Sequence, residues 1–151
     1  MESAEKISIE SNNTRILNIR HLKLAFGNFD ISAHGKQENG VMDFTVTVEQ
    51  KNALSKKNKG IGVLTNIKFS HPDTNESIID YSSEIVYEID YFDTVITKLN
   101  GKTEIHKPFL NFIYLISLST ARGLLYEKLS NSPYNKVFLP ILELEHLYRE
   151  R

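Results

Sequence analysis

The sequence lacks several features that would assign it to a chemical class. Its 151 residues include no cysteine, which excludes a disulfide framework, a thiolate metal site and a cysteine nucleophile. Its 18 lysines and arginines nearly balance its 19 aspartates and glutamates, whereas a protein that binds nucleic acid normally has a basic face. We therefore expect no nucleic-acid partner.

Long hydrophobic runs are also missing. The longest, 109–118, is roughly half the ~20 residues that a membrane-spanning helix needs. Residues 1–13 are polar and lack the apolar stretch typical of a signal peptide. We expect a cytoplasmic protein without membrane insertion, with a flexible segment over 1–13 and a single domain over 14–151.

Hydrophobic residues mostly alternate with polar ones up to about residue 96, which is the period of a β-strand. The alternation predicts four strands, at about 15–26, 42–49, 61–69 and 78–92, with a long polar connection over 51–60. A change of phase at Arg20 and His21 predicts a bulge in the first strand. The four strands are expected to form an antiparallel meander with one face in water.

After Pro108 the period changes to that of a helix. A long helix is predicted over about 109–129, and Pro140 opens a short final helix over about 141–149. Strands followed by helices indicate an α+β fold, with both helices packed on one face of the sheet.

The long helix has more apolar residues at its start than one sheet can cover. One stripe suits packing on the sheet: Leu110, Tyr114, Leu118, Ala121, Leu125 and Leu129. Phe109, Phe112, Leu115 and Ile116 fall largely outside this stripe and need a second partner. Another subunit is the favoured explanation; a captured ligand, or segment 93–107 folded over the helix, is the alternative.

Aromatic residues gather where the fourth strand leads to the long helix, and others end the first strand. Together they predict a groove for extended apolar segments of other proteins. Its expected lining is Phe26, Phe29, Tyr91, Phe92, Phe109 and Phe112. For any one of these residues, a place in the ordinary core is the alternative.

Residues 120–144 read TARGLLYEKLSNSPYNKVFLPILEL. This segment resembles the C-terminal part of the SecB family of protein-export chaperones, in which an Ala-Arg pair lies in a long helix and a Leu-Pro step opens the last one. Ala121-Arg122 and Leu139-Pro140 hold those places. The order of four strands and two helices extends the resemblance over roughly 14–149.

The resemblance implies an ATP-independent holdase that binds unfolded or nascent polypeptides in apolar surface grooves. It also implies a homotetramer, a dimer of dimers with the long helices between two sheets. The expected subunit contacts in this chain are Phe112, Leu115, Ile116, Ser119 and Arg122. Family members outside export are associated with toxin–antitoxin systems, where the chaperone protects an aggregation-prone antitoxin, and this role would suit the chain.

In the export branch of the family, acidic residues on the sheet and a C-terminal tail dock the translocase motor. Glu84, Glu88 and Asp90 fall near such an acidic position. The first strand departs from the pattern, with Arg20, His21 and Ala25 where acidic residues are expected, and the sequence stops at Arg149-Glu150-Arg151 without a tail. Both departures count against motor docking.

Enzyme chemistry has little support in the sequence. No serine lies in a Gly-x-Ser-x-Gly motif, and the histidines stand in unlike contexts. Glu143 and His146 have helical spacing, but a di-iron site needs that motif twice. We expect no catalytic residue, metal or cofactor. A dedicated oligomeric adaptor, or an α+β protein with a small-ligand pocket between sheet and helix, is the alternative function.

Overall fold

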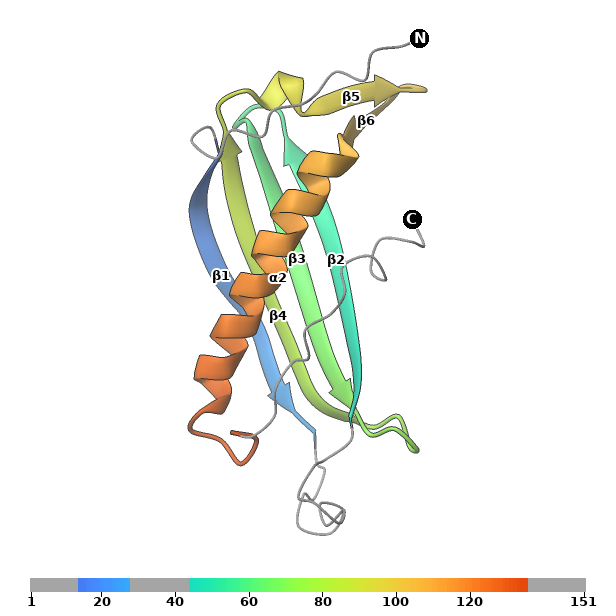
Figure 1. Ribbon diagram of the computed structural model, residues 1–151, viewed down its shortest axis with the longest axis vertical. Coiled ribbons are helices and arrows are strands. Elements are labelled where there is room, and N and C mark those ends of the chain that lie inside the picture. Colours follow the sequence, from blue (N-terminus) through green and yellow to red (C-terminus); the bar gives the residue numbers. More distant parts are fainter. Residues whose placement is uncertain (1–13, 28–43, 136–151) are drawn as a thin grey trace.

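The computed structural model describes residues 14–27 and 44–135, and its main element is a four-stranded antiparallel sheet (Figure 1). The strands are β1 (Thr14–Phe26), β2 (Thr45–Ser55), β3 (Gly60–Ser70) and β4 (Ser77–Ile89). Their order across the sheet is β1-β4-β3-β2. The predicted α+β fold with four antiparallel strands is confirmed.

The meander prediction is right for β2, β3 and β4 and wrong for β1. Three consecutive strands are joined by short turns, whereas β1 lies beside β4, the last of them, which is a Greek-key arrangement. Residues 27–44 separate β1 from β2, and a connection of this length lets β1 cross to the far edge of the sheet.

The strand limits also differ from the expected ones. β2 and β3 pair without a shift from Thr45 opposite Ser70 to Ser55 opposite Gly60, so most of the predicted polar connection is strand. The bulge in β1 is confirmed, as a register shift between His21 and Lys23, and a second shift near Ile16 was not predicted.

Segment 92–105, expected to be loop after residue 92, contains a short 3₁₀ helix, η2 (Phe92–Thr94), and a hairpin of β5 (Ile96–Leu99) and β6 (Lys102–Ile105). Asn100 and Gly101 form the turn, with φ of 51° and 77°, as in the Asn-Gly turns that favour two-residue hairpins. Strands of four residues are too short to show a convincing alternation in the sequence.

The long helix α2 (Lys107–Leu129) crosses the sheet and packs on β3 and β4 (Figure 1). Pro108 lies in its first turn, where a missing backbone N–H costs nothing. We call the covered side of the sheet the inner face and the other side the outer face. α2 is also long and apolar enough to span a membrane, judged by length and composition alone. The core helix of a soluble protein can meet the same two criteria. The predicted helix over 141–149 and the segment 1–13 lie outside the described residues.

Buried polar contacts fix the helix on the sheet. Gln50 of β2 donates to the backbone oxygen of Tyr114 over 2.9 Å. The hydroxyl groups of Tyr87, on β4, and Ser117, on α2, lie 2.7 Å apart. Burial raises the pKa of Tyr87, and its hydrogen bond with Ser117 opposes that shift. Because such buried groups lose energy when left unpaired, these contacts favour one position of α2 along the sheet.

Candidate functional site

β1 exposes apolar side chains along its whole length. Ile16, Ile19 and Phe26 share the inner face with buried residues of β4, yet they are 46%, 41% and 45% exposed. Leu17 and Leu22, at the two register shifts, are 57% and 51% exposed. Within the described residues β1 pairs on one side only, so its other edge presents backbone donors and acceptors beside apolar side chains. Such an edge is prone to pair with another chain.

α2 presents a second surface, on the side away from the sheet. Leu115 is 41% exposed, and Ser119 and Gly123 follow at steps of four residues, both exposed. Arg122 beside them is half-buried. A Cβ added at Gly123 would meet no atom within 4 Å, so nothing in the described chain demands a glycine there. Because glycine has no side chain, this position would let the backbone of another chain approach the helix closely.

The remaining apolar residues at the start of α2 have partners within the chain. Phe109 is 2% exposed and lies in a buried cluster with Phe92, Val95 and Ile105 from the preceding segment. Phe112 and Ile116 are partly buried against the same cluster. The alternative that segment 93–107 covers the helix is therefore correct for part of this surface, and Leu115 is the residue left exposed.

The structure does not bring the predicted groove residues together. Phe92, at 3% exposed, and Phe109 are core residues, so we no longer assign them to a groove, and Phe29 lies outside the described residues. Phe26 pairs with Ile79 near the start of β4, whereas Tyr91, 60% exposed, follows the end of that strand. The two lie at opposite ends of a strand about 40 Å long.

Phe26 is nevertheless a constrained side chain. Its ring stacks on that of Tyr134, with centroids 5.2 Å apart and planes 9° from parallel. Tyr134, in the turn after α2, is 6% exposed. The stacked ring therefore offers one exposed aromatic face in a fixed orientation, as a binding surface for apolar groups requires.

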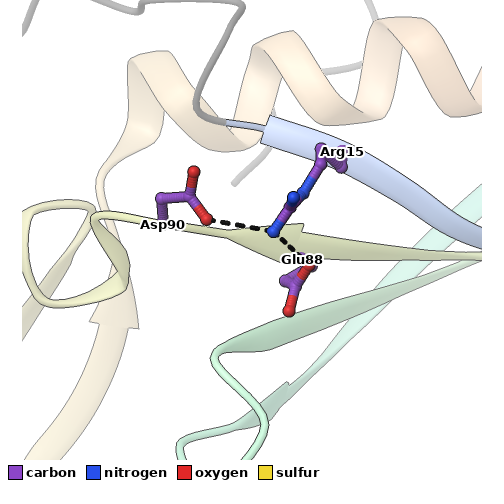
Figure 2. Close-up of polar contacts among 3 residues, drawn as sticks. All are labelled: Arg15, Glu88 and Asp90. Atoms are coloured by element: carbon purple, nitrogen blue, oxygen red, sulfur yellow. Dashed lines mark hydrogen bonds and ion pairs between the residues drawn. The ribbon is translucent and has the colours of Figure 1, made fainter.

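The three predicted docking carboxylates lie on or beside the outer face of β4, and each is engaged by a cation of β1. Arg15 Nη2 is 2.6 Å from Glu88 Oε2 and 3.2 Å from Asp90 Oδ1 (Figure 2). Arg20 pairs with Glu84. Arg20 departs from the family pattern, and the pairing of β1 with β4 places its positive charge beside the carboxylate of Glu84.

The alternative from the sequence was a small-ligand pocket between sheet and helix. One hollow in the described part of the chain lies instead on the outer face of the sheet, and polar side chains line it. It is lined by Lys23, Thr47, Glu49, Asn66, Lys68, Asp80 and Ser82. Over 14–27 and 44–135, no three histidines or carboxylates come together in a way that would hold a metal.

No family model and no curated protein sequence matches the chain. Among solved structures, the chain is similar to a Mycobacterium tuberculosis SecB-like chaperone in complex with a ChAD peptide from an antitoxin, with 9% identity, a TM-score of 0.52 and 88% of each chain covered. The chain has a SecB-like fold.

The SecB-like fold agrees with the resemblance seen in residues 120–144. A protein of unknown function from Streptococcus agalactiae is also similar, at 14% identity over 86% of this chain and 96% of that one. The TM-score of that similarity is 0.40.

Proposed function

We propose that this protein is an ATP-independent chaperone, a holdase that keeps unfolded or nascent polypeptides from aggregating in the cytoplasm. The observation that carries the proposal is exposed apolar surface on a SecB-like fold, which includes Phe26 and Tyr91 besides the free edge of β1. The similar Mycobacterium tuberculosis chaperone was solved with a bound peptide, which supports peptide binding by a protein of this shape.

The two apolar surfaces support an assembly of several copies. Two β1 edges can pair antiparallel about a twofold axis, because a twofold interface places the same patch on both partners. Such pairing would bury Leu17 and Leu22. The α2 surface around Leu115 and Gly123 is separate and would join two such dimers. Two different self-complementary surfaces suit the proposed homotetramer, a dimer of dimers.

Client segments need apolar surface that this assembly leaves open. We assign client contact to Phe26 and Tyr91, which lie at the ends of the sheet, away from the middle of β1 and from the Leu115 surface. The peptide in the similar structure comes from an antitoxin. This favours a dedicated client of a toxin–antitoxin pair over general export.

The test combines mass and activity. Light scattering should give the mass of a tetramer, and the protein should slow the aggregation of heat-denatured citrate synthase without ATP. Tyr91→Ser should weaken this effect while leaving the mass unchanged. Leu99→Ser is the matched control, because Leu99 is equally exposed, at 58% against 60%, but lies on the tip of the β5–β6 hairpin. A monomer that does not affect aggregation would refute the proposal.

A further inference from the structure

The outer face of the sheet carries a strip of four carboxylates. Inward-pointing residues of β4 alternate with outward-pointing ones, and three of the outward residues are acidic; a fourth acid follows the strand. The strip consists of Asp80, Glu84, Glu88 and Asp90. Unopposed, four negative charges along one strand would attract a cationic partner from solution.

β1 supplies the opposing charges from within the chain. Arg15 holds two of the carboxylates at once, those of Glu88 and Asp90, at 2.6 and 3.2 Å (Figure 2). Arg20 and Glu84 stand directly opposite each other in the register of β1 and β4 and form an ion pair.

The fourth carboxylate is engaged as well. Lys23 Nζ lies 2.6 Å from Asp80 Oδ2, although the residue opposite Lys23 in the register is Ser82. This diagonal contact follows directly after the register shift between His21 and Lys23. Each acid of the strip therefore has a cation of β1 within contact distance.

We propose that the cations of β1, by pairing with these carboxylates, prevent cationic protein partners from binding to the outer face of the sheet. A basic partner would have to displace arginines that are already held beside the carboxylates by the backbone pairing of β1 with β4. The two members of each ion pair are far closer together than the screening length of about 8 Å. A distant basic partner therefore experiences their summed charge, which is that of three cations and four carboxylates. Motor docking of the kind found in the export branch then does not occur through Glu84, Glu88 and Asp90.

The pairs lie at the surface, which makes the inference testable. The side chains of Arg15, Arg20 and Lys23 are 59%, 54% and 53% exposed, and those of the carboxylates are 24–48% exposed. Removing the cations therefore leaves solvated carboxylates rather than buried unpaired charges, and exposed pairs of this kind contribute little to folding.

The test measures binding of a fluorescein-labelled lysine octapeptide by anisotropy. Arg15→Ala/Arg20→Ala/Lys23→Ala should bind it about ten-fold more tightly than the unchanged chain, and about 0.5 M salt should remove the gain. Lys102→Ala/Lys107→Ala/Lys128→Ala is the control, because it alters net charge equally at exposed positions on β6 and α2. An equal gain in both variants would overturn the proposal, as would tight binding by the unchanged chain.

A second variant keeps the β1 cations in place. Glu84→Gln/Glu88→Gln should alter octapeptide binding by less than about two-fold, because these carboxylates are already engaged; a large loss of binding would contradict the proposal. Neither measurement depends on holdase activity. A chain that fails to suppress aggregation but shows the expected octapeptide binding would refute the proposed function and leave this inference standing.

Discussion

Replacing Gly123 by alanine tests whether another chain packs on α2. Glycine in a helix interior costs about 1 kcal/mol relative to alanine, and Gly123 lies well inside the helix Lys107–Leu129. The added Cβ would meet no atom within 4 Å. In an isolated chain, Gly123→Ala should therefore raise the free energy of unfolding by about 1 kcal/mol, or the melting temperature by roughly 2–4 °C.

In the proposed tetramer the same substitution has the opposite effect. A methyl group forced into a close helix–helix contact costs about 1–3 kcal/mol, so the dissociation constant of the assembly should rise about 5- to 150-fold. Light scattering across a dilution series measures the dissociation constant, and urea unfolding at each concentration measures stability. Lys128→Ala, exposed in the last turn of the same helix, should leave the mass unchanged. If Gly123→Ala raised stability at every concentration with unchanged mass, the inference of a close contact at Gly123 would be refuted.

Three further predictions follow from the packing. Leu115→Asp should dissociate the subunits, because a charge buried without a partner at their contact costs several kcal/mol. The fold of each subunit should be unchanged, since Leu115 is exposed in the single chain. An unchanged mass in light scattering would contradict this. Tyr87→Phe should cost about 1 kcal/mol in urea unfolding through loss of the hydrogen bond with Ser117. The raised pKa of Tyr87 makes the unchanged chain lose stability above about pH 10, where the unfolded tyrosine gives up its proton first, and the variant should lose less. Gly27→Ala should lower stability by at least about 2 kcal/mol, because its Cβ would lie 1.7 Å from the backbone oxygen of Ser77; a melting temperature equal to that of the unchanged chain would contradict this.

The elements with a long, clean period were predictable. The helix over 109–129 agrees with α2 because its apolar stripe continues for several turns, and most of the stripe is buried as expected: Tyr114, Leu118, Ala121, Leu125 and Leu129. The β5–β6 hairpin was missed, although its Asn100-Gly101 turn is a strong local signal. Its strands have four residues each, which is too short for the alternation to distinguish them from loop.

The site was less predictable than the fold, since it depends on which strands are neighbours. A chain that ran as a simple meander would place β1 beside β2. The observed neighbour of β1 is β4, in antiparallel register, and this places Arg15 and Arg20 beside carboxylates of β4. The alternation of apolar residues is the same in both arrangements, so it does not distinguish them.

The sequence by itself determined the class of this protein. The change of hydrophobic period near Pro108 requires strands followed by a long helix, and the absence of cysteine removes thiol chemistry. Only the tertiary structure decided that Arg15 and Arg20 pair with carboxylates of β4. It also decided that, of the apolar residues at the start of α2, Leu115 is exposed whereas Phe109 is buried in the core. The physical reason is distance along the chain: periodicity reports local geometry, whereas the pairing of residues more than 60 positions apart depends on how the whole sheet is assembled.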